Sequence, residues 1–146
     1  MDILTHAAIG IIAAGAFIET PELALGMLAG SVAPDLDVLS RLFGKRSMLH
    51  CHQTASHSVF TLTLVAGLLA VTPLGTAAAV GFLAGGLLHV LMDYTNTLGV
   101  TLLWPVNKRR MQVGWVFFID AWVMAVTLSG AVLTVFSIIV SSHSSW

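Results

Sequence analysis

Charged residues are scarce in this 146-residue sequence. Only 9% of its residues are charged, whereas a soluble domain usually carries about a quarter, and 57% are hydrophobic. Six Lys and Arg face seven Asp and Glu, for a formal net charge of −1, so no basic field is present to attract a nucleic acid. We therefore exclude nucleic acid as a partner. The high hydrophobic content also excludes a disordered protein and a soluble two-domain enzyme.

Cysteine and the common catalytic motifs are also nearly absent. The single cysteine, Cys51, cannot form an intramolecular disulfide, and between His50 and His52 it is either a small apolar filler or a further metal ligand. There is no GxSxG, P-loop or dinucleotide-binding motif, so serine-nucleophile and nucleotide-driven mechanisms have no support. The N-terminus lacks the positive region of a secretory signal, and we expect its first apolar segment to be retained.

Long apolar runs, in contrast, make up most of the sequence, which has a mean hydropathy of +0.93. Turns that contain proline, glycine or charge separate the runs 3–18, 23–32, 58–71, 76–93 and 115–140. This pattern predicts an all-α, polytopic helical membrane protein with about 4–5 membrane-embedded helices in one domain, residues 1–146. Run 23–32 is too short to cross a hydrocarbon layer of ~30 Å alone.

The basic residues indicate an orientation. All of them fall in two segments: Arg41, Lys45 and Arg46 in the first, and Lys108, Arg109 and Arg110 in the second. The positive-inside rule places both segments in the cytoplasm, and the two helices between them leave the cytoplasm and return. We therefore expect a multi-pass protein with a cytoplasmic N-terminus. The second segment either contacts anionic lipid or binds a phosphate group of a substrate.

Two pairs of glycines are spaced four residues apart, Gly26 with Gly30 and Gly81 with Gly85. Such pairs let membrane helices approach closely. We expect them to pack within one chain, and they predict no particular oligomer.

Histidine and aspartate recur near the predicted cytoplasmic ends of the apolar runs. Such residues are costly in a bilayer and usually face a cavity, a partner or an ion. The residues concerned are His6, Asp35, Asp37, His52, His57, His89, Asp93 and Asp120. Each has a simpler explanation when taken alone, such as a packing histidine, a helix cap, or an ion pair of Asp120 with Lys108 or Arg109. Their convergence on one membrane face predicts a metal site.

The spacing within the motifs supports shared ligation. His89 and Asp93 are four residues apart, which places them on one helix face where one metal could touch both. Asp35 and Asp37 follow Pro34, which breaks helix geometry, so they could reach two ions or one ion and a bound water.

The loop before run 58–71 leaves two arrangements open. On a continuous helix His52 and His57 would diverge, whereas both can turn inward if the helix begins at an N-cap such as Ser56. Imidazole binds Zn and other first-row metals, and carboxylates bridge ions and orient histidines. Two metals about 3.5–4 Å apart would activate a water for phosphoester hydrolysis. We therefore predict divalent metal cofactors, Zn or else Mn or Fe, with one to three ions per chain.

The polar residues fall in four motifs: Thr5-His6-x-x-x-Gly10, Ala33-Pro34-Asp35-Leu36-Asp37, His52-Gln53-Thr54-Ala55-Ser56-His57-Ser58 and Gly85-x-x-x-His89-x-x-x-Asp93-x-x-Thr97-x-Gly99. In this order they resemble the YdjM-type family of LexA-regulated, membrane-bound metal-dependent hydrolases. The resemblance continues as far as Phe118-Ile119-Asp120.

This resemblance implies a small protein of the bacterial inner membrane, distantly similar to zinc phospholipase C and to nucleases that cut phosphoesters. It carries the family's polar motifs to His6, Asp35, His52 or His57, His89 and Asp93, with Asp37 and Asp120 as accessory acids. The family commonly has Arg and Thr where this chain has Gln53 and Ser56, so one candidate phosphate contact is missing.

The expected function is that of a membrane-bound metal-dependent hydrolase. Because the site faces the lipid headgroups, the expected substrate is a phosphoester of a membrane lipid or a lipid-linked phosphate. We expect Asp35, Asp37 and Asp93 to be catalytic, and Arg109 and Arg110 to bind substrate. Two alternatives are a metal-ion or proton transporter, which needs polar residues across the full membrane depth, and a scaffold, which would tolerate replacement of the cluster.

Overall fold

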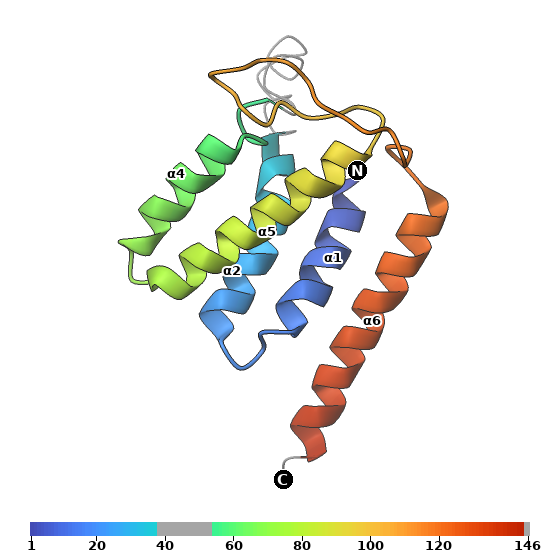
Figure 1. The fold of residues 1–146 in the computed structure, drawn as a ribbon. Coiled ribbons are helices and arrows are strands. Elements are labelled where there is room, and N and C mark those ends of the chain that lie inside the picture. The colour runs from blue at the N-terminus through green and yellow to red at the C-terminus, as the bar shows by residue number, and fades with distance from the viewer. Residues whose placement is uncertain (38–53, 145–146) are drawn as a thin grey trace.

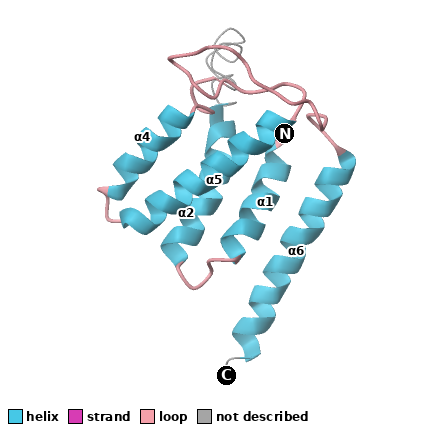
Figure 2. Cartoon of the chain, in the orientation of Figure 1, coloured by secondary structure: helices cyan, strands magenta, loops and turns pink. Residues whose placement is uncertain are grey.

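The computed structural model describes residues 1–37 and 54–144, which form helices joined by turns and loops (Figure 1; Figure 2). In chain order the helices are α1 (Ile3–Gly15), α2 (Pro21–Val32), α4 (Val59–Ala70), α5 (Gly75–Thr95) and α6 (Ala121–Ser144). Strand-like pairing in these residues is limited to two isolated bridges, Asn96 with Val116 and Val100 with Met111. The predicted all-α class is confirmed.

Two helices in the described ranges, α5 and α6, are long and apolar enough to cross a membrane. Our expectation of about 4–5 embedded helices is therefore wrong as a number of spans. Helices α1 and α4 are apolar but contain only 13 and 12 residues. At about 1.5 Å per residue they reach about 20 Å, which is short of a hydrocarbon layer of ~30 Å. Apolar sequence continues to Ile18, but α1 already ends at Gly15.

Helix α6 is shifted along the chain from run 115–140. It begins at Ala121 because the carboxylate of Asp120 accepts hydrogen bonds from the backbone N–H groups of Trp122 and Val123. It continues to Ser144, through most of the serine-rich segment that follows run 115–140.

The two glycine pairs form the contact between α2 and α5. A Cβ atom added to Gly30 would collide with the carbonyl oxygen of Phe82, and Gly26, Gly81 and Gly85 face the backbone of the opposite helix equally closely. Only glycine permits this approach of two helix backbones. The pairs therefore pack within one chain, as expected.

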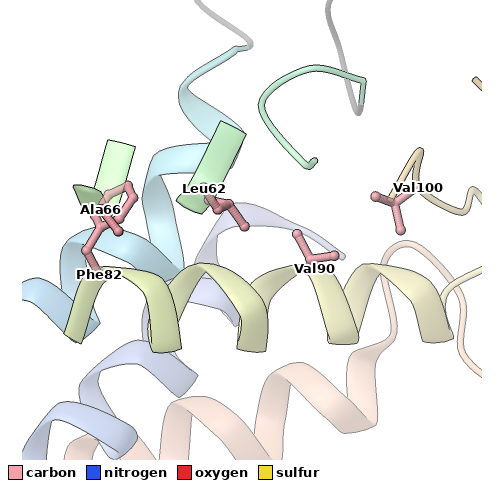
Figure 3. Close-up of a cluster of buried hydrophobic side chains, with 5 residues drawn as sticks. All are labelled: Leu62, Ala66, Phe82, Val90 and Val100. Atoms are coloured by element: carbon pink, nitrogen blue, oxygen red, sulfur yellow. The ribbon is translucent and has the colours of Figure 1, made fainter. Parts of the chain in front are cut away.

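Helix α4 covers another part of α5 through a small apolar core (Figure 3). Leu62 and Ala66 of α4 meet Phe82 and Val90 of α5, and Val100 closes the cluster from the loop that follows α5. This core fixes the start of α4 near the end of α5.

The polar end of the bundle is the structural basis of the site. Figure 1 shows the start of α1, the end of α2, the start of α4, the end of α5 and the start of α6 at the same end of the molecule. The loop from residue 96 to residue 120 crosses this end. Residues from distant parts of the sequence are thus brought to one depth.

Candidate metal centre

Helix α5 supplies two residues of the site from its last two turns. His89 and Asp93 are both completely buried, and His89 Nε2 lies 3.6 Å from Asp93 Oδ2. The spacing of four residues places them on one face, as predicted. Both side chains point into the bundle, where they meet residues from other helices.

Helix α1 brings His6 to the same place. Its start is fixed by Asp2, whose carboxylate accepts hydrogen bonds from the backbone N–H of Thr5 at 3.0 Å and from the Thr5 hydroxyl at 2.6 Å. His6 therefore lies in the first turn, fully buried, with Nε2 3.2 Å from Asp93 Oδ1. Its ring stacks on that of His89 with centroids 3.6 Å apart.

Asp35 arrives from the short 3₁₀ turn that follows α2. Its Oδ1 lies 3.6 Å from His89 Nε2 and 3.7 Å from His57 Nε2. His6, Asp35, His89 and Asp93 each present a ligand atom, and these atoms all lie within 4.8 Å of one another. Four residues from three segments of the chain thus meet at one point.

His57 is the fifth member of the cluster. It precedes α4, whose N-cap is Ser58 rather than Ser56, since the Ser58 hydroxyl accepts from the backbone N–H of Phe60 at 3.2 Å. The chain is therefore not helical at His57, and its imidazole turns inward with no exposed surface. His57 Nε2 lies 3.1 Å from His89 Nε2 and 3.3 Å from Asp93 Oδ2. We call His6, Asp35, His57, His89 and Asp93 the His/Asp centre.

Neighbouring groups set the tautomer of His89. Its Nδ1 lies 2.7 Å from the carbonyl oxygen of Ser31, and because a carbonyl only accepts, Nδ1 carries the hydrogen. The neutral ring then turns the lone pair of Nε2 toward the centre. Histidines that bind metals are oriented by this kind of hydrogen bond on the other nitrogen.

The side chains of Ser56 and Asp37 set the tautomer of His57 in a similar way. The hydroxyl of Ser56 donates to Asp37 Oδ2 at 2.7 Å, which leaves its oxygen free to accept from His57 Nδ1 at 2.9 Å. Asp37 Oδ2 itself lies 3.6 Å from the same Nδ1. Asp37 therefore lies on the outer side of His57, where it orients the ring.

The residues of the centre fit a divalent metal ion. Lone pairs of His57 and His89 and the oxygens of Asp35 and Asp93 converge in a buried space, where they repel one another unless a cation or a proton lies among them. Asp35 Oδ2, Asp93 Oδ2 and His6 Nδ1 are buried without a hydrogen-bond partner among the described residues. Imidazole and carboxylate together match Zn, Mn or Fe in ligand chemistry.

One comparison with known proteins bears on the setting of this site. The family model described as YdjM inner membrane protein matches residues 1–145. The chain belongs to the YdjM family of inner membrane proteins. No curated protein and no solved structure matches the chain.

Membership of the YdjM family confirms the resemblance drawn from the four motifs, and the two helices that could cross a membrane agree with it. Each motif also delivers side chains to the polar end of the bundle. The first three motifs contribute one residue each to the centre, namely His6, Asp35 and His57 in that order. The fourth motif contributes two, His89 and Asp93.

Other residues that we expected at the site lie elsewhere or outside the described ranges. Asp120 is not in the His/Asp centre, because its carboxylate caps α6. His52 and Cys51 fall outside the described residues. Arg109 and Arg110 are exposed in the loop after α5, where the Arg110 guanidinium donates to the carbonyl oxygen of Leu98 at 3.4 Å.

Several groups that touch the centre were not foreseen. Asn96 donates to Asp93 Oδ1 at 2.8 Å, and the Met1 amino group contacts the same oxygen. Burial lowers the pKa of this amino group to about 6, although the carboxylates of Asp35 and Asp2 oppose the shift. An amide three residues after a helical aspartate is a signal that could have identified Asn96, whereas the backbone carbonyl of Ser31 leaves no mark in the sequence.

Proposed function

We propose that this protein is a membrane-bound metal-dependent hydrolase that cleaves a phosphoester of a lipid or a lipid-linked substrate. The observation that carries the proposal is the His/Asp centre, three imidazoles and two carboxylates buried together at one end of the bundle. A divalent metal ion bound there would supply Lewis-acid activation of a water molecule and of the phosphoryl oxygens.

The chain's own residues divide the remaining work. His57 and His89 present Nε2 toward the centre, each held by a hydrogen bond at Nδ1. Asp35 leaves Oδ2 without a hydrogen-bond partner, and this oxygen is suited to accept the proton of the attacking water. Asp37 acts through Ser56 and His57, which makes it a positioning residue in this proposal, whereas we had expected it to be catalytic.

The setting of the centre supports a lipid substrate. The centre lies at the end of α5, one of the two helices that could cross a membrane, and close to the loop that leads to the other. That loop carries Lys108, Arg109 and Arg110, and the positive-inside rule then favours a cytoplasmic centre, a cytoplasmic N-terminus and a multi-pass chain. Phosphate groups of lipids lie at this depth.

Transport of a metal ion or proton is the alternative use of such a cluster. A pathway needs polar groups along the full depth of the bundle. Among the described residues the buried polar side chains outside the polar end reduce to Thr127 on α6, whose hydroxyl is bonded to the backbone of its own helix. The distribution therefore favours chemistry at one membrane face.

The test is hydrolysis by the full chain in detergent or vesicles. The protein would be stripped with a chelator, reloaded with Zn, Mn or Fe, and supplied with phospholipids and lipid phosphates while released phosphate or phosphoester is measured. We expect activity that needs the metal and is lost in Asp35→Asn. His143→Ala is the matched control, because His143 is an exposed histidine at the far end of α6. Metal-dependent ion flux without hydrolysis would overturn the proposal in favour of transport.

A further inference from the structure

The loop between α5 and α6 exposes an unusual amount of apolar surface. Its exposed apolar side chains include those of Val113, Trp115, Phe117 and Ile119, and Trp115 and Phe117 are 78% and 71% exposed. Val116 and Phe118, which alternate with them, are less exposed. Large aromatic side chains rarely lie this open in a water-facing loop. We call residues 106–119 the strap.

The strap is held in place by hydrogen bonds to the end of α5. The backbone N–H of Val113 donates to the carbonyl oxygen of Tyr94 at 2.9 Å, and that of Trp115 donates to Thr95, also at 2.9 Å. The bridge between Asn96 and Val116 continues the pairing. The aromatic side chains are therefore presented outward by an ordered backbone.

Basic side chains belong to the same strap. Lys108 and Arg109 are exposed, and the turn that carries them is closed by the backbone N–H of Arg109 donating to Asn107 Oδ1 at 2.9 Å. Aromatic rings beside cationic groups are typical of segments that lie in the headgroup region of an anionic leaflet.

The position of the strap matches that depth. It is the second part of the loop that connects the end of α5 to the start of α6, the two helices that could cross a membrane. Trp122, in the first turn of α6, is 83% exposed and continues the apolar surface into the span. We propose that the strap inserts into the interface of an anionic leaflet, with Trp115 and Phe117 among the upper acyl chains and Lys108 and Arg109 against lipid phosphates.

This insertion would also fix the depth of the His/Asp centre. The backbone of the strap donates hydrogen bonds to the carbonyl oxygens of Tyr94 and Thr95, and the next residue, Asn96, donates directly to Asp93. A leaflet that holds the strap therefore holds the end of α5 at headgroup level. The inference concerns lipid contact alone and stands whether or not the centre hydrolyses anything.

The test uses tryptophan fluorescence of the full chain in vesicles. Trp104, Trp122 and Trp146 are replaced by Phe, so that Trp115 is the one fluorophore, and a second chain keeps Trp104, which is half-buried, as the control. The vesicles contain phosphatidylcholine with or without phosphatidylglycerol, brominated near the carbonyl end or near the methyl end of the acyl chains.

We expect Trp115 to be quenched more strongly by bromine near the carbonyl end, and more strongly than Trp104. Phosphatidylglycerol should increase the quenching, and Lys108→Gln with Arg109→Gln should remove most of that increase, since each basic residue favours an anionic surface by about fivefold. Quenching of Trp115 by aqueous acrylamide but not by brominated lipid would overturn the proposal. Protection from both quenchers would also overturn it, because a protein partner would then cover the strap.

Discussion

The two helices that could cross a membrane, α5 and α6, are built in different ways. Of the most apolar window of α5, 44% is buried in the protein, compared with 11% for α6. Helix α5 carries His89 and Asp93 and packs its glycines against α2, whereas α6 lies along α1 and has its one ionisable residue, His143, near its far end. Two helices that are both long and apolar enough to cross a membrane therefore differ in position: α5 is a core helix that carries residues of the candidate site, and α6 is an outer helix with most of its surface exposed.

In this protein the helix that carries the candidate site is distinguished from the other by its buried ionisable residues. A metal ligand needs a low-exposure position with partners from other segments, and α5 provides it because its glycines allow close packing against α2 and α4. Helix α6 exposes Val132, Leu133 and Phe136, side chains that lipid tails solvate well. Substitutions of the same kind on the two helices should consequently have unequal effects.

The largest effect is expected for Asp93→Asn on α5. The change keeps the shape of the side chain but removes the charge that faces His6, His57 and the Met1 amino group. Metal affinity should fall by more than about 100-fold, since loss of outer partners alone costs 10–100-fold. Titration with Zn, read by calorimetry, measures this loss. An unchanged affinity would show that Asp93 is not a ligand.

The second-largest effect, on the free energy of unfolding, is expected where α5 packs most tightly against α2. A Cβ at Gly85 would collide with the backbone of Met27 on α2, so Gly85→Ala should lower the free energy of unfolding by about 1–3 kcal/mol. On α6, Gly130→Ala meets only the flexible end of Ile12 and should cost less. Gly67→Ala, which meets nothing, is the control. Thermal unfolding of the variants in one detergent gives the ranking, and equal midpoints for Gly85→Ala and Gly130→Ala would contradict it.

Asn96→Ala should weaken metal binding without unfolding the protein. Asn96 lies at the end of α5 and donates to Asp93 Oδ1, while its own Oδ1 accepts from the backbone N–H groups of Leu98 and Gly99. Loss of an outer partner of a ligand costs about 10–100-fold in affinity. Asn96→Asp keeps the two accepted bonds but not the donor, so both variants should lose metal affinity if the bond to Asp93 is the cause. Full affinity in Asn96→Asp would assign the effect to the turn instead.

The smallest effect is expected for Asp120→Ala at the start of α6. Removal of this cap should destabilise the helix by about 1 kcal/mol and leave the bound metal unchanged. Metal content and thermal midpoint, measured on the same preparation, separate the two outcomes. A loss of metal would restore Asp120 as a ligand, the role that we expected from the convergence of His and Asp on one membrane face.

Much of the centre could be predicted from the sequence because its signals are local. The spacing of His89 and Asp93, and the break at Pro34 before Asp35, specify local geometry, and the small residues of α2 and α5 predict close approach. The number of spans could not be predicted from apolar runs, because α1 ends at Gly15 although apolar residues continue to Ile18.

Partners that depend on tertiary structure were also beyond sequence reasoning. Asp120 has the residue type and the approximate position of a ligand, yet its backbone neighbours use it as a cap. The relay from Asp37 through Ser56 to His57 joins residues that are far apart in the sequence, with Asp37 and Ser56 separated by 19 positions. Only the packed structure distinguishes a carboxylate that faces the centre from one that orients a ligand.

The central claim is that the His/Asp centre binds a divalent metal, and the most direct measurement is elemental mass spectrometry of the purified full chain without a histidine tag. Intact protein and His143→Ala should carry at least one equivalent of Zn, Mn or Fe, and His89→Ala should lose it. His89→Gln, which keeps more of the buried volume, separates loss of a ligand from loss of the fold. The same metal content in the intact chain, His89→Ala and His89→Gln, or none in the intact chain after reloading, would contradict the account.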